Sequence, residues 1–526
     1  MLRKNAKVLS KDIIRPMLRY VKGNWGIMAL FIVFVAVLAT RLFFALMTPE
    51  FSTDTAYFVL EQVENISRTG FPEIADSGSG GMTILPPVFY YILAFFNLFM
   101  PIFVVGKVVP NVLAASTVFI VYAISMKFTR NQEASLFAAS LSGFIPVFFL
   151  ETFNSISIYS LVVPLVLFSF YSFLMISNDD KFIPIYIGSI LLLSFTHPTV
   201  FFVVAAQLLY FTFVKVEGLN HKNVEIEAIL VSVFIVIWSQ FLIFKNAFIE
   251  YGTNIIWQNI PAQIFAEYFH TITILDAVTL IGIVPTFAGV SVFFRYVRER
   301  KSKFIFFFLS YSIPIFIMLW LRMIIPKTGL ILISVALVVV LSKYYQIFLN
   351  YLKKTKFSSF RVPIVAVAVI ITFLTTLSPT FALINSRIEE APEHDKVQIL
   401  EWARENTPED STILSSYEEG FLVRYYTRRT TVVDSNFLLS EDIGAILDDI
   451  DEFFTTIYVI DALRILEKYD VDYIFVSEKI VGRYGEDSMS VLDNERCFNN
   501  VFMGKDGANS LYEVTCSLRS GERDGQ

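Results

Sequence analysis

The sequence has few of the residues on which soluble metal-dependent and nucleotide-dependent enzymes rely. Its 526 residues include two cysteines and four histidines, with no HExxH motif and no cysteine pair at zinc-ligand spacing, which argues against a zinc hydrolase. Neither GxxxxGK[ST] nor GxGxxG occurs, so nothing supports a nucleotide-driven cytosolic reaction. Charged residues are also scarce, at 17 %. Soluble proteins carry about a quarter, so a cytosolic enzyme and a disordered protein are excluded.

Apolar residues dominate instead, and the charges are unevenly distributed. Hydrophobic residues make up 55 % of the chain, 54 residues are phenylalanine, and the mean hydropathy is +0.60. Residues 1–388 carry 29 basic and 18 acidic side chains, whereas residues 389–526 carry 13 basic and 30 acidic ones. The net charge of −6 therefore combines a basic, apolar body with an acidic, water-soluble tail, which also excludes a simple single-span receptor.

The body is predicted to be embedded in a membrane, because apolar runs of about 17–25 residues recur along it. The first run, 25–47, follows seven basic residues and continues into Thr48-Pro49-Glu50 without a cleavage site. It is therefore interpreted as a retained span with the N-terminus inside. Further predicted spans are 102–126, 133–150, 157–177, 182–196, 198–215, 225–246, 273–294, 304–321, 327–343 and 362–384.

The stretch 85–100 decides the sidedness of the rest. If it only dips in from the outer face, as Pro86-Pro87 at its start suggests, the basic loops 295–303 and 353–356 fall inside. We therefore predict a polytopic α-helical membrane protein with about 11–13 transmembrane helices, in which 1–387 is the membrane domain and 48–101 its first outer loop. The predicted location is the cytoplasmic membrane, with the acidic tail outside.

The tail, 388–518, is predicted to be an extracytoplasmic α/β domain. Short apolar strands are expected at 411–415, 430–433 and 472–477, with helices at 396–406, 441–454 and 458–469. The last unit is interpreted as a hairpin flanked by Cys497 and Cys516, which form either a disulfide or two inert buried thiols. Residues 519–526 are expected to be disordered.

Ionisable residues at the outer ends of spans are costly, so they are the candidate functional groups. Asp54 follows the first span, where it is either functional or the N-cap of the next helix. Arg322 flanks an outer turn, as a substrate ligand or as an anchor to lipid headgroups. The other outer-face candidates are Glu151, His197, Glu267, His270 and Lys327.

Several segments resemble the GT-C superfamily of polytopic membrane glycosyltransferases, which use sugars linked to polyprenyl phosphate. Residues 54–57 (DTAY) and 85–91 (LPPVFYY) resemble the D-x-x-Y and PPL-Y-Y patterns of the first outer loop. In the tail, 401–410 (EWARENTPED) and 429–436 (RTTVVDSN) are similar to segments of archaeal oligosaccharyltransferase catalytic subunits. The resemblance covers the layout of nearly the whole chain, although its specific motifs are few.

The resemblance implies transfer of a sugar, with inversion, from a polyprenyl-phosphate-linked donor to a glycan, lipid or protein acceptor. Asp54 would be the general base or, with Glu151, a ligand of a divalent cation (Mg²⁺ or Mn²⁺). Arg322 and Lys327 would bind the phosphate. The implied partners are the lipid-linked donor, the acceptor and membrane lipids, with no nucleic acid. Further substrate contacts are assigned to Glu267, His197, His270 and Tyr57.

Two departures from the oligosaccharyltransferase pattern keep other functions open. Residues 416–420 read SYEEG where that family carries WWDYG, and 155–157 read SIS at the second acidic motif. An oligosaccharyltransferase is therefore the alternative, followed by a non-catalytic GT-C-like protein or a transporter. No internal repeat of the kind common in transporters is present in the sequence.

Overall fold

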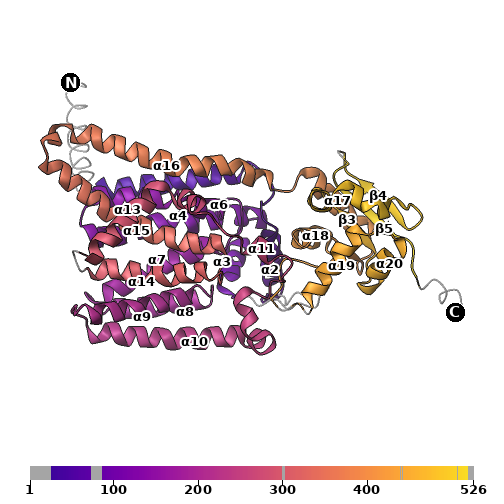
Figure 1. Ribbon diagram of the computed structural model, residues 1–526, viewed down its shortest axis with the longest axis horizontal. Coiled ribbons are helices and arrows are strands. Elements are labelled where there is room, and N and C mark those ends of the chain that lie inside the picture. The colour runs from indigo at the N-terminus through magenta and orange to yellow at the C-terminus, as the bar shows by residue number, and fades with distance from the viewer. Residues whose placement is uncertain are drawn as a thin grey trace, which may run out of the picture.

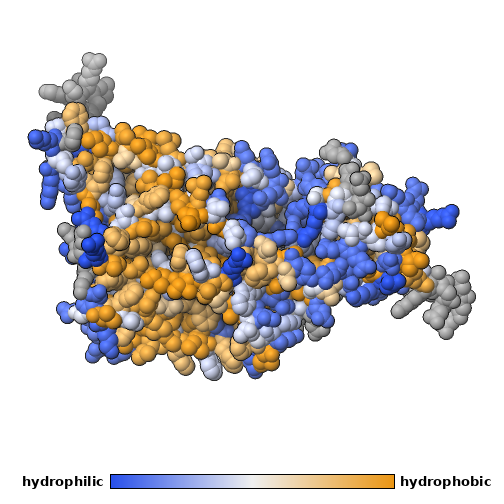
Figure 2. Space-filling view, viewed as in Figure 1, coloured by the Kyte–Doolittle hydropathy of each residue, from blue (hydrophilic) through white to orange (hydrophobic). Residues whose placement is uncertain are grey.

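The computed structural model describes residues 25–72, 86–298, 302–438, 440, 442–505 and 507–518. It consists of a long helical bundle and a smaller α/β domain at one end of that bundle (Figure 1). The basic N-terminal segment, Leu85, part of the loop 295–303 and the tail 519–526 lie outside the described residues. Figure 2 shows a predominantly apolar bundle surface, with hydrophilic residues at its far end and over the α/β domain.

Within the part of the chain that the structure describes, seven helices are long and apolar enough to cross a membrane. Counted together as one span, α12 (Ile274–Ile281) and α13 (Ile283–Arg298) bring the number to eight, and this span is bent by 98°. Three further apolar helices are shorter: α3 (Val88–Asn97), α8 (Phe182–Ser194) and α9 (Val200–Val216). The seven long helices are Trp25–Ala45, α4 (Ile102–Thr129), α7 (Tyr159–Ile176), α10 (Asn223–Tyr251), α14 (Lys303–Trp320), α15 (Pro326–Lys354) and α16 (Arg361–Glu389).

The polytopic α-helical class is confirmed, but the predicted count of 11–13 spans is higher than the number of long helices. The run 133–150 is divided into α5 (Gln132–Ser142) and α6 (Pro146–Leu150), with Pro146 at the first position of the second helix, where its missing N–H costs nothing. The run 273–294 bends at Gly282, whose φ of 106° suits glycine alone. Thirteen-residue α8 reaches only about 20 Å, less than a bilayer core.

The predicted half-helix is a short helix at the end of the bundle that faces the α/β domain. Helix α3 has ten residues and follows Pro87, so it extends about 15 Å, roughly half of a bilayer core. It packs on α2 (Asp54–Thr69), the helix of the first loop, next to the α/β domain (Figure 1).

The α/β domain contains a five-stranded sheet in the order β2-β1-β3-β5-β4. Strands β1 (Thr412–Leu414), β2 (Thr430–Thr431) and β3 (Tyr473–Val476) are parallel, as alternating strands and helices favour. The hairpin of β4 (Phe498–Met503) and β5 (Ser510–Val514) completes the sheet in antiparallel register. The helices of this domain are α17 (His394–Asn406), α18 (Gly420–Thr427), α19 (Ile443–Thr455), α20 (Val459–Lys468) and α21 (Glu478–Tyr484), with the 3-10 turn η3 (Glu486–Asp493). Two further 3-10 turns, η1 (Gly252–Trp257) and η2 (Lys356–Phe360), lie in loops of the bundle.

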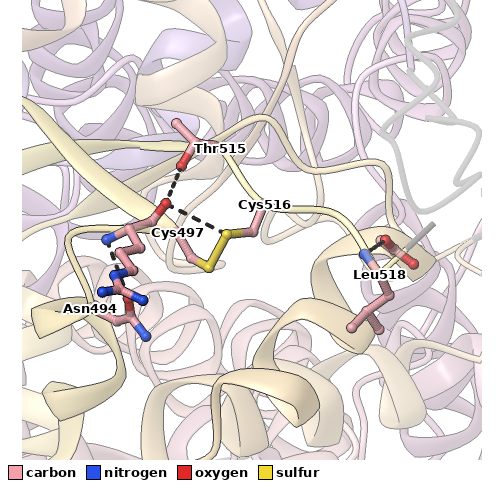
Figure 3. The surroundings of a disulfide bond; sticks show 7 residues. Asn494, Cys497, Thr515, Cys516 and Leu518 are labelled. Atoms are coloured by element: carbon pink, nitrogen blue, oxygen red, sulfur yellow. Dashed lines mark hydrogen bonds between the residues drawn. A yellow bond between two sulfur atoms is a disulfide. The ribbon is translucent and has the colours of Figure 1, made fainter. Parts of the chain in front are cut away.

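A disulfide closes the base of the terminal hairpin. Cys497 and Cys516 are joined, with their Cα atoms 4.7 Å apart (Figure 3). The neighbouring amide of Thr515 donates to the carbonyl of Cys497 at 2.9 Å. Of the two alternatives for these cysteines, the structure therefore has the disulfide.

A buried lysine connects the segment before α2 to the bundle. Lys107 of α4 is 4 % exposed, and its ammonium donates to the carbonyls of Thr48 (3.2 Å) and Glu50 (2.7 Å) and to the side chain of Asn154. The Asn154 amide in turn donates to Ser52 at 2.7 Å. This one side chain therefore fixes where the chain enters α2 and where the loop after α6 lies.

We expect Lys107→Met to destabilise the folded protein. The substitution removes the donor to the Thr48 carbonyl and to the Asn154 side chain, at a cost of about 1–3 kcal/mol for each buried unsatisfied group, whereas the Glu50 carbonyl keeps its bonds from Thr48 and Asn154. The measurement is the thermal midpoint of the detergent-purified protein, with Lys127→Met, at an exposed position of the same helix, as the control. Equal midpoints for the two variants would contradict this role.

Candidate active site at the junction of the bundle and the α/β domain

Asp54 lies at the start of α2 and contacts the α/β domain. Its Oδ1 accepts the amide of Leu422 at 2.8 Å and its Oδ2 that of Phe421 at 3.4 Å. Both amides belong to the first turn of α18, so Asp54 caps a helix 368 residues further along the chain. No side chain caps α2 itself, so Asp54 is not the N-cap of the helix that follows the first span.

The electrostatic surroundings of Asp54 favour proton uptake. Burial raises the pKa of its carboxyl well above the ordinary value, and the nearby charge of Asp434 raises it further, whereas the two amides and Lys479 lower it. A higher pKa makes the ionised form of this carboxyl a stronger base.

Two ion pairs continue the contact between α2 and α18. Arg424 donates to Glu61 through Nη2 at 2.7 Å and through Nε at 3.0 Å. One turn further along α18, Arg428 pairs with Glu64 at 2.6 Å. The acidic face of α2 therefore lies against the basic face of α18.

Tyr57 is buried in the same contact. Its hydroxyl donates to Glu50 at 2.9 Å, and the hydroxyl of Tyr426 donates to the same carboxylate oxygen at 2.6 Å. With 1 % exposure, Tyr57 is placed to hold the loop against α18, and a substrate would reach it only after a rearrangement.

Glu267, in the segment before α12, also contacts the α/β domain. Its carboxylate accepts the Tyr417 hydroxyl at 2.6 Å and pairs with Arg483 at 3.4 Å. Arg483 also lies 3.6 Å from Glu418. After burial, the charges of Glu418, Asp54, Glu267 and Asp434 all raise the pKa of Tyr268, in the short helix α11 (Phe265–Tyr268), so these acidic groups surround one tyrosine.

A second cluster of polar side chains contains three of the predicted residues, Glu151, Lys327 and His197. Glu151 pairs with Lys327 at 3.1 Å and with Arg387 at 2.6 Å. Close by, the Tyr159 hydroxyl bonds Thr328 at 2.7 Å, and its ring lies 5.3 Å from that of His197. Burial lowers the pKa of His197 to about 4, so this imidazole is neutral at neutral pH.

Arg322 and His270 are exposed. Arg322 has a φ of 53°, and its carbonyl accepts the indole N–H of Trp257 at 2.9 Å. Its guanidinium makes no hydrogen bond or ion pair with any other residue that the structure describes. The His270 ring lies 3.2 Å from the carbonyl of Glu267. Of the two, Arg322 has a side chain available for an anion.

The predicted cation ligands have different partners. Asp54 is engaged by the α18 amides and Glu151 by two basic side chains. Within the described ranges, no three His, Cys, Asp or Glu side chains form a set that could hold a metal ion. The residues present do not fit a divalent-cation site, so we derive no step through one.

The sequence patterns missed several residues of this junction. Asp434 and Glu418 lie in segments that were compared with other proteins, but neither was predicted as a site residue. Arg424, Tyr268 and Arg483 were not predicted at all. One signal could have found Arg424: the acidic pair 61 and 64 and the basic pair 424 and 428 each have the spacing of one helical turn.

Solved structures share this fold. The archaeal oligosaccharyltransferase AglB from Archaeoglobus fulgidus, bound to an inhibitory peptide and a dolichol-phosphate, matches with a TM-score of 0.70 and 14 % identity, over 95 % of this chain and 76 % of AglB. ArnT from Cupriavidus metallidurans, bound to undecaprenyl phosphate, matches with a TM-score of 0.54 and 10 % identity, over 92 % of this chain and 97 % of ArnT. The mycobacterial arabinofuranosyltransferase AftD matches with a TM-score of 0.54 and 11 % identity, over 92 % of this chain and 40 % of AftD.

The chain therefore has the fold of the GT-C membrane glycosyltransferases, which confirms the resemblance at the level of the fold. Among these three structures, the oligosaccharyltransferase has the highest TM-score. No family model and no curated protein matches the sequence.

Asp434 gives the junction a testable pH dependence. Burial raises its pKa to about 6, from the ordinary 3.8, although Arg424 opposes this. A raised pKa means that the folded state holds the proton more tightly, so the contribution of Asp434 to the free energy of unfolding falls as pH rises from about 4 to about 6. We expect the Asp434→Asn variant, which cannot titrate there, to gain up to about 3 kcal/mol relative to wild type across that window. The measurement is the thermal midpoint of both proteins at pH 4 and at pH 7. A difference between variant and wild type that is the same at both pH values would contradict the prediction.

Proposed function

We propose that the protein transfers a sugar from a polyprenyl-phosphate-linked donor to an acceptor hydroxyl at the outer face of the membrane, with inversion. The observation that carries the proposal is the position of Asp54, where the apolar bundle meets a water-soluble domain and a carboxylate is held by two backbone amides. A donor with a lipid tail and a polar sugar needs such a boundary. The lipid phosphates bound to AglB and ArnT, which share the fold, also support it.

In this proposal, Asp54 takes the proton of the acceptor hydroxyl. The oxygen then attacks the anomeric carbon on the face opposite the phosphate, and the bond from that carbon to the phosphate oxygen breaks. Polyprenyl phosphate leaves with the bonding electron pair, and the configuration at the anomeric carbon inverts. No further energy source is needed, because the phosphate ester is itself activated.

Arg322 is the best candidate for binding the departing phosphate. Its guanidinium offers forked donors and has no acidic partner in the described part of the chain. Lys327 is less suited than the sequence suggested, because Glu151 already neutralises part of its charge. Glu151 pairs with Lys327 at the start of α15 and with Arg387 near the end of α16, so it holds these two helices together.

The acceptor is proposed to be a hydroxyl of a glycan, a lipid or a protein, not the asparagine of a sequon. In the segment that replaces WWDYG, Tyr417 and Glu418 are engaged by Glu267 and Arg483. The alternative of an oligosaccharyltransferase predicts transfer to a peptide with Asn-x-Ser/Thr, and a transporter predicts no cleavage of the donor.

We expect Asp54→Asn to abolish transfer, because the amide side chain cannot accept the proton. The measurement is release of polyprenyl phosphate from a panel of polyprenyl-phosphate-linked sugars by the purified protein in lipid vesicles. Asp461→Asn, at the first turn of α20 on the domain surface, is the matched control and keeps wild-type turnover. Undiminished release by a correctly inserted Asp54→Asn variant would refute the mechanism.

The proposed sidedness places the disulfide outside the membrane. We expect a membrane-impermeant reductant followed by a membrane-impermeant maleimide to label Cys497 and Cys516 in sealed right-side-out vesicles. These are the only cysteines of the chain, so no background thiol interferes. Without the reductant, Lys353→Cys, at the opposite end of α15, should label only after detergent is added, because Cys497 and Cys516 stay in the disulfide. The reverse pattern would place the α/β domain inside.

A further inference from the structure

Helices α2 and α18 meet through several polar contacts, including a hydrogen bond from the Tyr425 hydroxyl to Glu64 at 3.1 Å. Asp54 holds the α18 amides, Glu61 pairs with Arg424 and Glu64 with Arg428. Seven residues separate Asp54 from Glu61, so the contacts of these two residues lie about 10 Å apart along α2. The question is whether the ion pairs only hold two domains together, or whether one of them sets the geometry of Asp54.

Arg424 differs from Arg428 in its surroundings. Its side chain is 10 % exposed, against 32 % for Arg428. Besides the two bonds to Glu61, its Nη1 lies 3.3 Å from the carboxylate of Asp434. Its guanidinium also lies 5.1 Å from the ring centre of Phe421, one of the two residues whose amides hold Asp54. Arg424 therefore contacts α2, the 433–436 segment and the first turn of α18 at once.

The first turn of α18 is also confined from the other side. A Cβ atom on Gly420 would lie 2.3 Å from the carbonyl oxygen of Val433 and 2.7 Å from the Cα of Asp434. Helix α18 therefore begins in direct contact with the segment that Arg424 binds. Any change in that segment would move the amides of Phe421 and Leu422.

We propose that Arg424 is a positioning residue for Asp54. By binding Glu61 and Asp434 together, it sets the separation of α2 and α18 at which the Phe421 and Leu422 amides orient the Asp54 carboxylate. The inference rests on the proposed function, because it assigns a purpose to that orientation, and it goes beyond it by naming a residue that touches neither donor nor acceptor. Arg428, with the same pairing one turn further away, serves only to hold the domains together.

The test compares Arg424→Met with Arg428→Met, since each removes one ion pair between the same two helices. We expect Arg424→Met to lower kcat by about 10- to 100-fold, as misplacement of a catalytic group by about 1 Å does, with KM for the donor unchanged. Arg428→Met should keep wild-type kcat. Equal losses in both variants, or a change in KM alone, would overturn the assignment.

A second pair of variants covers the case in which Arg424→Met does not fold. Gly420→Ala should show the same loss of kcat at unchanged KM, because its methyl group displaces the first turn of α18. Gly482→Ala on α21, where nothing lies within 4 Å of the added carbon, is its control. Wild-type kcat in Gly420→Ala would count against the proposal.

Hydrogen exchange separates this inference from the proposed function. If Arg424 positions Asp54, we expect Arg424→Met to speed hydrogen exchange of the Phe421 and Leu422 amides. Arg428→Met should leave the exchange of these two amides unchanged. If wild type turns over none of the donors but this exchange pattern is found, the proposed function fails and the positioning geometry stands. Unchanged exchange in Arg424→Met, in a protein that does turn over donor, refutes the positioning alone.

Discussion

A single ammonium group in the apolar bundle determines how the end of the bundle beside the α/β domain is built. Lys107 lies near the start of α4 and binds the carbonyls of Thr48 and Glu50 and the side chain of Asn154. Burying a cation among membrane helices is costly unless its hydrogen bonds are satisfied, so the two loops that satisfy them cannot move independently. One of these loops leads into α2 and Asp54, and the other carries Glu151. Both candidate clusters therefore depend on the same buried contact.

The contact between the two domains reverses the charges of the domains themselves. The bundle region is basic overall and the α/β domain is strongly acidic, yet at the junction α2 supplies Glu61 and Glu64, and α18 supplies Arg424 and Arg428. At the junction, each partner therefore carries the sign of charge that is the minority in its own domain, and Arg424 also pairs with Asp434. Partial burial makes these pairs more sensitive to geometry than exposed ones, since a buried charge that loses its partner is costly. This explains how a small water-soluble domain can be held in a defined position against a membrane bundle.

The sequence predicted the class of the fold because its signals are local: apolar runs of spanning length, and alternating short strands and helices in the tail. It overestimated the spans where one residue interrupts a run, as before Pro146 and at Gly282. It missed α18, because a helix of eight residues that starts with glycine and contains two tyrosines has no clear helical pattern. The candidate site was predictable only in part. Asp54 was found from its place after the first span, but its partner Leu422 lies 368 residues away, and no local pattern states which distant segments meet.

The turn that carries Arg322 and the segment beside α18 are connected through one loop, which links the proposed phosphate ligand to the proposed base. Trp257 donates its indole N–H to the carbonyl of Arg322, and two residues later Asn259 donates to the carbonyl of Phe437 at 3.0 Å. Phe437 follows closely after Asp434, the carboxylate that binds Arg424. The turn that presents Arg322 is thus hydrogen-bonded, through a short stretch of chain, to the segment beside the helix that holds Asp54. A displacement of the α/β domain would therefore alter both the proposed base and the proposed phosphate ligand, so neither can be treated as belonging to one domain alone.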